Sequence, residues 1–501
     1  MLKIFLFGLG AVFAALILLV AIVIIRTLNY GGPADSVQEI TLSDVGAFDA
    51  DLIAERLGEA IRFRTITVAP GDPRPGLEGP WLEMQAWMEE TYPAFHAAVS
   101  KETIPGGYSL LYTWQGSDAT LAPILLMAHQ DVVPVNIGTE GDWEARPFSG
   151  VVQDGFVFGR GAIDDKGSMV GQFEALERLA SEGFQPRRTI LFMLGHDEEV
   201  SGSGAAAGIE LIRSRDMVPA MVLDEGFMAI EANPLTGDTL AFIGVAEKGY
   251  ITIEITASAQ GGHSSTPPRD SATIRLSRAL LALEENQMPS DLSKEPIKTL
   301  LESAGPDMPF AQRMAFANQW LLGFAIEGAA ADNPPLNAMI RTTTAPTMLV
   351  GSTKENVLAQ RATAIINFRI HPNDTEDDIV AHIERVTAGI DGLTITRGRS
   401  GIRGTGASPV SPMDNRAYAV LHAVAKDATG GASVAPGLVL GATDSRYANA
   451  ITDNVYRFMP ALMNLDELSG FHGTNERISV ENMGRMARGY TQIILAMDEG
   501  D

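Results

Sequence analysis

Three short apolar runs, each followed by an acidic residue or a histidine, constrain this chain most strongly. The runs and the polar residues that follow them are 123–128 before His129, 189–195 before Asp197-Glu198-Glu199, and 219–223 before Asp224. Uninterrupted apolar runs of this length are typical of strands buried on both faces, as in parallel sheets covered by helices. Ligands of such sheets bind beyond the carboxyl ends of the strands. We therefore expect the polar side chains to lie together at one edge of a sheet.

The periodicity of the remaining chain predicts two globular units. Helical patterns such as 167–180 and 205–213 alternate with the apolar runs, which predicts an α/β unit with a mostly parallel sheet. Near Ala246 the pattern changes to alternating strands at 250–257 and 361–370 with a helix at 270–285, which predicts a smaller α+β unit inserted into the first. The predicted segments are an apolar N-terminal segment at 1–28, a linker at 29–48, the first part of the large unit at 49–245, the smaller unit at 246–372 with an insertion at 288–354, and the second part of the large unit at 373–501.

The N-terminal segment predicts a single transmembrane helix. Residues 4–25 carry no charge and are bracketed by Lys3 and Arg26, and a helix of this length spans roughly 30 Å of hydrocarbon. A signal peptide is the alternative, but its apolar core is usually about 7–15 residues long. No clear small-residue cleavage site follows Ile25. We expect an uncleaved single-pass anchor with the body outside the cytoplasm.

Composition excludes several classes of function. The net charge of −25 argues against nucleic-acid binding, which needs a basic surface. The chain contains no cysteine, so disulfides and thiolate metal sites are excluded. A metal would have to be held by histidine and carboxylates.

Three motifs contain the candidate catalytic and metal-binding residues, and each can also be explained without a metal. His129-x-Asp131 pairs a possible metal ligand with a carboxylate that can fix the tautomer of its ring. The same two residues could also belong to an ordinary surface loop. The glycine-rich turn around Asp164 can present that carboxylate to a metal, or Asp164 can cap the helix that follows. The three consecutive acids at 197–199 repel one another unless cations or protons neutralise them, which favours a metal nearby. The alternative is an exposed acidic turn, surrounded by water, that needs no metal.

Taken together, these motifs resemble those of the dizinc aminoacylase/carboxypeptidase family of metallopeptidases. The matching segments are MAHQDVVPV, GRGAIDDKG, GHDEEVSGSGA, the strand ending at Asp224, GGHSSTPP and FHGTNERIS. The resemblance extends from about residue 50 to the C-terminus. GATDSRY, VYRFMP and the insertion at 288–354 are most similar to the Gly-X carboxypeptidases (carboxypeptidase S) and the N-fatty-acyl-amino-acid synthase/hydrolases.

The resemblance implies a ligand set for two Zn²⁺ ions, with Mn²⁺ or Co²⁺ as possible substitutes. His129 and Asp224 would hold one metal ion. Glu199 and His472 would hold the other, and Asp164 would bridge the two.

The resemblance also implies roles for residues that hold no metal. Asp131 would orient His129, and Glu198 would be the catalytic carboxylate that moves the proton. The smaller unit would act as a lid and dimerisation domain. Its His263 would stabilise the oxyanion, and in dimeric members of the family it does so at the active site of the partner subunit. Arg369 and Asn356 would bind the substrate carboxylate and neighbouring groups. Apart from the resemblance, Arg446 is a further candidate for substrate binding, as a second anion contact. His263 and Arg369 could also be ordinary surface residues, and Arg446 could only brace its loop.

The function implied by the resemblance is hydrolysis of an amide whose leaving part is an amino acid with a free carboxylate. The substrate would be a short peptide or an N-acyl amino acid, and the sequence leaves the two open. A non-catalytic, metal-braced receptor domain at the membrane is the alternative from another class. That alternative would be favoured by loss of Glu198 or of a ligand, and every one of them is present.

Overall fold

The larger unit is built around one eight-stranded mixed sheet. The computed structural model describes residues 2–32, 37–398 and 404–499. The strands, in spatial order, are β1 (Ser100–Thr103), β2 (Leu110–Trp114), β6 (Ile190–Gly195), β3 (Ile124–His129), β7 (Met221–Ile230), β16 (Val455–Met463), β8 (Leu240–Glu247) and β15 (Ser433–Val439). The four neighbours β6, β3, β7 and β16 are parallel, whereas β1 and β2 join antiparallel at one edge. The sheet is therefore mixed, and its parallel centre contains all three predicted runs.

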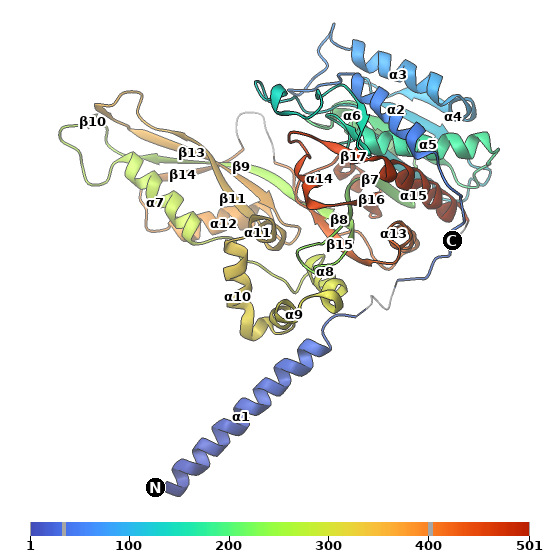
Figure 1. The fold of residues 1–501 in the computed structure, drawn as a ribbon. Coiled ribbons are helices and arrows are strands. Elements are labelled where there is room, and N and C mark those ends of the chain that lie inside the picture. The colour runs from blue at the N-terminus through green and yellow to red at the C-terminus, as the bar shows by residue number, and fades with distance from the viewer. Residues whose placement is uncertain (1, 33–36, 399–403, 500–501) are drawn as a thin grey trace.

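Helices cover both faces of this sheet (Figure 1). Ile124, Leu126 and Ala128 of β3 pack in the core on one face, while Leu125 and Met127 pack in the core on the other. The first core is closed by α2 (Ala50–Arg62), α4 (Pro93–Ala98), α5 (Lys166–Ser181), α13 (Arg416–Ala428) and α15 (Val480–Asp498). The second is closed by α6 (Ser203–Ser214) and the 3-10 helix Asp444–Ala450. Burial on both faces explains why these strands are apolar throughout.

The smaller unit contains a four-stranded antiparallel sheet. Its spatial order is β11 (Thr343–Val350), β13 (Arg361–Ile370), β9 (Gly249–Ser258) and β14 (Leu393–Arg397). Alternate residues of β9 and β13, including Ile253 and Ile366, pack under α7 (Ala272–Glu285) and α12 (Glu376–Thr387). The short strands β10 (Gly262–His263) and β12 (Val357–Leu358) pair at the end that points away from the larger unit (Figure 1). Because α12 and β14 belong to this unit, the boundary expected at residue 372 is too early, and the chain returns to the larger unit only after β14.

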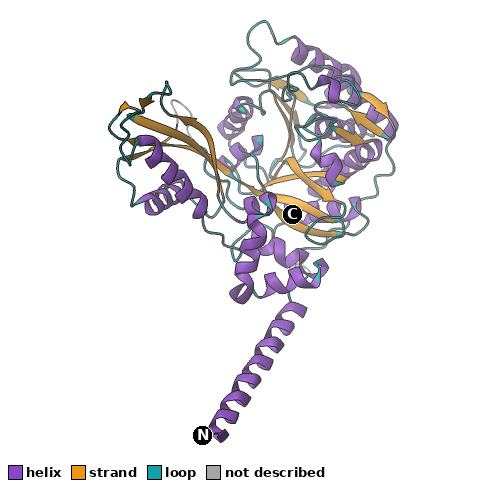
Figure 2. Ribbon diagram, turned by 60° about the vertical axis from the view of Figure 1, so that its left-hand side comes forward, coloured by secondary structure: helices purple, strands orange, loops and turns teal. Residues whose placement is uncertain are grey.

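The helices of the insertion share a core with the larger unit. Its helices are α8 (Ile297–Ala304), α9 (Phe310–Ala317), α10 (Gln319–Ala331) and α11 (Pro334–Ile340). Leu300 and Leu301 of α8 and Ile326 of α10 share a core with Leu240 of β8 and Leu438 of β15. The segment was expected to belong to the smaller unit. Its last part does form β11 of the smaller sheet, whereas the apolar residues of its helices are buried mainly against the larger unit. Figure 2 shows these helices between α1 and the two sheets.

The N-terminal helix α1 (Leu2–Leu28) projects from the body at the end where α9 lies (Figure 1). Within it, Leu6–Leu28 is long and apolar enough to cross a membrane, with a mean hydropathy of 3.1. A signal sequence near an N-terminus satisfies the same criteria.

The remaining elements border the site or the sheet edge. They are α3 (Gly79–Thr91), α14 (Leu465–Ser469), and a small sheet of β4 (Val151–Gln153), β5 (Phe156–Phe158) and β17 (Arg477–Ser479).

Candidate metal centre

Two groups of possible metal ligands share one carboxylate, that of Asp164. The first group is His129, Asp164 and Glu225, and the second is Asp164, Glu199 and His472. His129 Nε2 lies 2.9 Å from Asp164 Oδ1, and His472 Nε2 lies 2.7 Å from Asp164 Oδ2. Each oxygen of Asp164 thus faces a different histidine, which is the arrangement a carboxylate needs to bridge two cations.

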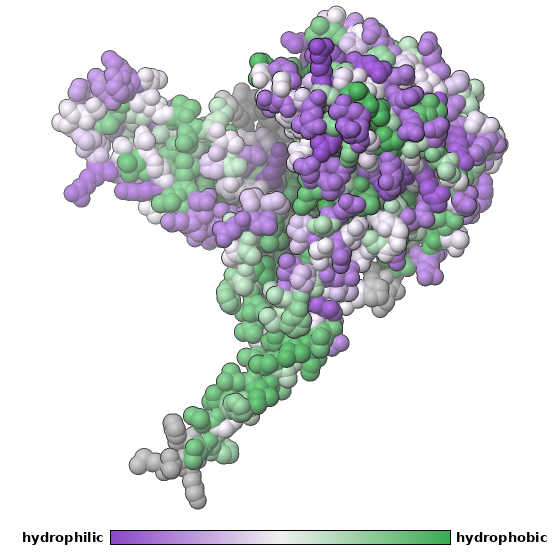
Figure 3. All heavy atoms as spheres, viewed as in Figure 1, coloured by the Kyte–Doolittle hydropathy of each residue, from purple (hydrophilic) through white to green (hydrophobic). Residues whose placement is uncertain are grey.

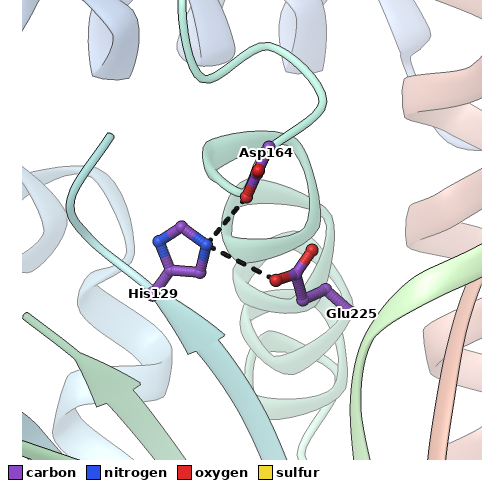
Figure 4. Close-up of side chains that lie close together, drawn as sticks. All are labelled: His129, Asp164 and Glu225. Carbon is purple, nitrogen blue, oxygen red and sulfur yellow. Dashed lines mark hydrogen bonds and ion pairs between the residues drawn. The ribbon is translucent and has the colours of Figure 1, made fainter. Parts of the chain in front are cut away.

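The other two carboxylates complete the groups on either side. Glu225 Oε1 lies 3.6 Å from His129 Nε2, and Glu199 Oε2 lies 3.2 Å from His472 Nε2. Figure 4 shows His129, Asp164 and Glu225 pointing toward one another from separate elements.

These residues meet at the edge of the sheet where β3 and β6 end. His129 is the last residue of β3, Glu225 lies within β7, and Glu199 lies in the turn after β6. Asp164 lies in the glycine-rich turn before α5, and His472 follows α14. His472 has a φ of 55°, in the left-handed region that non-glycine residues rarely adopt. The polar side chains therefore lie together beyond the ends of the parallel strands, as the sequence predicted.

The structure directs Glu225, not Asp224, toward the other ligands. Asp224 Oδ2 instead accepts the backbone N–H of Ser445 at 2.7 Å. Successive side chains of a strand point to opposite faces, so only one of two adjacent acids can face the cluster. The pairing of β7 with β16 also skips Glu225 and Gly226, and Gly226 has a φ of 135° that favours glycine. This bulge was not recognisable in the sequence. The expected ligand was Asp224, whereas the structure groups Glu225 with His129 and Asp164, and a ligand role for either acid stays a prediction.

Asp131 supports three parts of the site at once. Its Oδ1 lies 3.3 Å from His129 Nδ1, which leaves Nε2 facing Asp164. The same carboxylate accepts the backbone N–H of Glu198 at 3.1 Å and of Glu199 at 3.2 Å. The Asp131 carboxylate thus lies beside the histidine that it was predicted to orient, and it also holds the turn that carries both glutamates.

The three consecutive acids divide into different environments. Asp197 accepts the backbone N–H groups of Ser203 and Gly204 at the start of α6, so it has a structural role. Glu199 belongs to the ligand cluster. The side chain of Glu198 is 10% exposed, lies outside both ligand groups, and has Arg446 Nη1 at 3.8 Å.

Glu476 is a residue of the site that sequence reasoning missed. This fully buried carboxylate accepts the backbone N–H groups of Gly161, Ile163 and Asp164 at 2.9–3.1 Å and pairs with Arg160 at 2.6 Å. It ties the turn that carries Asp164 to the segment that carries His472. The acid within FHGTNERIS was the available signal, but its partner lies more than 300 residues away.

The charges of the cluster need compensation. Burial, with the nearby Asp164 charge, raises the pKa of Glu225 to about 8 and that of Glu199 to about 7. Hydrogen bonds to Asp164 and Glu199 raise the pKa of His472 to about 10. Crowded, buried carboxylates are stabilised by protons or by cations. Two imidazole nitrogens with three carboxylates are the donors that Zn²⁺ accepts, so these residues fit a pair of such ions.

In the part of the chain that the structure describes, the residues expected in the smaller unit make their contacts within that unit. His263 is exposed in β10 at the outer end of that unit, with its Nδ1 2.8 Å from Ser265 Oγ (Figure 1). Asn356 lies beside it and accepts the N–H of Ser264 through its backbone oxygen. Arg369 is half-buried near the start of β9, where its guanidinium lies over the Tyr250 ring.

Arg446 braces its loop, which is one of the two roles that the sequence left open. It donates to the backbone oxygens of Ser201 at 2.9 Å and Thr443 at 3.1 Å, so it braces the loop. It also lies beside Glu198, and its contact with an anion of the substrate stays a prediction.

The chain is similar to known peptidases and amino-acid hydrolases over most of its length. The model of a family described as peptidase family M20/M25/M40 matches residues 125–496. The N-fatty-acyl-amino acid synthase/hydrolase PM20D1 of Xenopus tropicalis is 33% identical over 98% of this chain and 95% of its own length. Carboxypeptidase S of Saccharomyces cerevisiae is 31% identical over 85% of this chain and 81% of its own length.

Solved structures share the fold. Human carnosine dipeptidase 1 superposes with a TM-score of 0.60 at 16% identity, covering 90% of this chain and 97% of that one. The M20 family metallo-carboxypeptidase Sso-CP2 of Sulfolobus solfataricus gives a TM-score of 0.58 at 16% identity, covering 89% and 98%.

Proposed function

This chain belongs to peptidase family M20/M25/M40 and is a metallohydrolase, and on that premise we propose that it is a dizinc enzyme releasing an amino acid with a free carboxylate. The observation that carries the proposal is the Asp164 carboxylate facing His129 with one oxygen and His472 with the other. We assign one Zn²⁺ to His129, Asp164 and Glu225, and the other to Asp164, Glu199 and His472. Bound there, the ions would act as Lewis acids toward the scissile carbonyl.

Glu198 is the proposed general acid and base. Burial raises the pKa of this carboxyl well above its usual range, which suits a group that accepts a proton and then delivers it to the leaving amine. Its backbone N–H is held by Asp131, so its position depends on the same carboxylate that orients His129. Asp131 is accordingly a positioning residue.

The smaller unit is proposed to supply substrate contacts as a lid. Arg369 suits the free carboxylate of the leaving amino acid because a guanidinium binds carboxylate through two parallel hydrogen bonds. His263, with Asn356 beside it, is proposed to act at the site of a second subunit, since both lie at the outer end of the smaller unit. Met348, Leu349 and Val350 are exposed along the edge strand β11, which supports a homodimer formed through this unit.

Two substrate classes fit this arrangement. Relatives named N-fatty-acyl-amino acid synthase/hydrolase favour an N-acyl amino acid, and those named carboxypeptidase S favour a short peptide. Both substrates share the free carboxylate and the scissile amide, and they differ only in the group on the other side of that bond. We propose further that α1 anchors the enzyme in a membrane with the body outside the cytoplasm.

A substrate panel tests the proposal directly. Dipeptides and N-acyl amino acids with the same leaving amino acid would be compared after loading with Zn²⁺, Mn²⁺ or Co²⁺. Release of the amino acid from at least one class, abolished by chelation and restored by metal, is the expected result. Failure of every metal-loaded form on both classes would contradict it.

A further inference from the structure

We propose that the segment formed by α9 and α10, residues 310–331, is a second membrane contact. It would lie in the headgroup region of the leaflet from which α1 emerges, so that the body is held against the bilayer at two points. This inference rests on the proposed anchoring by α1. It adds that the lipid leaflet covers an apolar surface of the folded body.

The end of α1 is part of the folded body and is bonded to this segment. The hydrogen bonds run from Asn318 Nδ2 to Val23 O at 3.3 Å and to Thr27 Oγ1 at 3.2 Å, from Arg26 Nε to Ala317 O at 3.1 Å, and from Arg313 Nη2 to Leu28 O at 3.0 Å. Thr27 is fully buried as a result. These bonds fix the α9–α10 segment relative to the helix proposed to cross the membrane.

The surface of α10 that faces away from the body is apolar. Phe324 is 75% exposed and Trp320 is 59% exposed, with Leu321 beside them. The spacing of these residues places them on one side of a helix, and the buried Ile326 lies on the other. Packing against the body accounts for the inner side alone.

One charged side chain lies on the same side of α10 as Trp320 and Phe324, and it is 46% exposed. The one ionisable residue of α10 is Glu327, which pairs with Arg341 and bonds to the Ser290 hydroxyl. Figure 3 shows apolar residues continuing from α1 onto the part of the body that it joins. An apolar surface continuous with a candidate membrane span favours lipid over a soluble partner.

The depth of the segment matches that of an interfacial helix. Asn318 meets α1 at Val23, five residues before the candidate span ends at Leu28. At 1.5 Å per residue this is about 7.5 Å along the helix. Interfacial helices bury their apolar side roughly 5–10 Å into the boundary between headgroups and acyl chains. Trp320 fits this region, since tryptophan is enriched at membrane interfaces.

The absence of cysteine from the chain makes a site-specific test possible. Single variants F324C, L16C and I137C of the full-length protein would be labelled with an environment-sensitive NBD fluorophore. Each would be placed at one copy per phosphatidylcholine nanodisc, with plain or brominated acyl chains. L16C reports on α1, and I137C is the matched control because Ile137 is 99% exposed in a loop of the larger unit.

The label at F324C is expected to show blue-shifted emission and to lose intensity in brominated lipid, while I137C does neither. Quenching of L16C without quenching of F324C would overturn the inference and leave the anchor intact. Quenching of neither would reject both. A blue shift at F324C without quenching would mean that protein, such as a second copy, covers the surface instead of lipid. Native tryptophan fluorescence gives an independent measurement, because brominated lipid should quench a component that W320F removes.

Discussion

The Glu476 carboxylate accepts the backbone N–H of Asp164 at 3.1 Å, across 312 positions of sequence. This bond joins the turn that presents the shared carboxylate to the segment that presents His472. Neither segment is regular secondary structure, so a buried acid takes over the positioning that a strand or helix would otherwise provide. The geometry of both proposed metal positions therefore depends on a residue that touches neither metal.

Replacing Glu476 should weaken metal binding. E476Q leaves the backbone N–H groups of Ile163 and Asp164 with a poorer acceptor and Arg160 without its charge partner. We expect a loss of about 10–100-fold in zinc affinity, as for other residues that orient metal ligands. Competition with a fluorescent chelator measures it. The control is E174Q, which removes a different buried glutamate paired with Arg56, and equal affinities in E476Q and E174Q would contradict the prediction.

Glu225 and Asp224 should differ in metal content. E225A removes a member of the first ligand group, whereas D224N changes a carboxylate that bonds to Ser445. We expect E225A to retain about one zinc per chain by elemental analysis, and D224N to retain two with a lower melting temperature. The reverse result would return the assignment to Asp224.

Glu198 should carry chemistry without holding metal. E198Q keeps the shape of the side chain and removes the group that moves the proton. We expect kcat to fall on the order of 10²–10⁴-fold with both metals retained. A variant with near wild-type turnover, or one that loses metal, would argue against this role.

Arg369 should recognise the free carboxylate of the substrate. R369A should raise KM about tenfold to a hundredfold for free-carboxylate substrates, which corresponds to roughly 1.5–3 kcal/mol for hydrogen bonds to a charged group. Amidated analogues should be little affected. R397A, on the edge strand β14 of the same sheet, is the control. Equal losses on both kinds of substrate would remove the carboxylate role.

Metal binding should release protons, and its affinity should rise with pH. Without metal, His472 with a pKa of about 10 and Glu225 with a pKa of about 8 are protonated at pH 7, and Glu199 with a pKa of about 7 is partly so. Metal must displace these protons, so affinity falls as the pH is lowered below these values. Calorimetry in buffers of different ionisation enthalpy counts the protons released. Binding without proton release would contradict the expected ligand set.

The sequence alone determined the elements that depend on local pattern. Apolar runs such as 123–128 predicted the buried parallel strands, because burial on both faces selects apolar residues along the whole strand. The polar residues at their ends then pointed to His129 and Glu199, the glycine-rich turn pointed to Asp164, and the family resemblance of FHGTNERIS pointed to His472. The long uncharged segment before Arg26 likewise predicted α1, since composition and length suffice for such a helix.

Only the tertiary structure decided which of two adjacent acids joins the cluster, because a bulge opposite β16 turns Glu225 inward and Asp224 toward Ser445. It also decided that Glu476 bonds to Asp164 and that the insertion packs on the larger unit and on α1. These relationships join residues distant in sequence, or depend on strand register. Local periodicity contains neither kind of information.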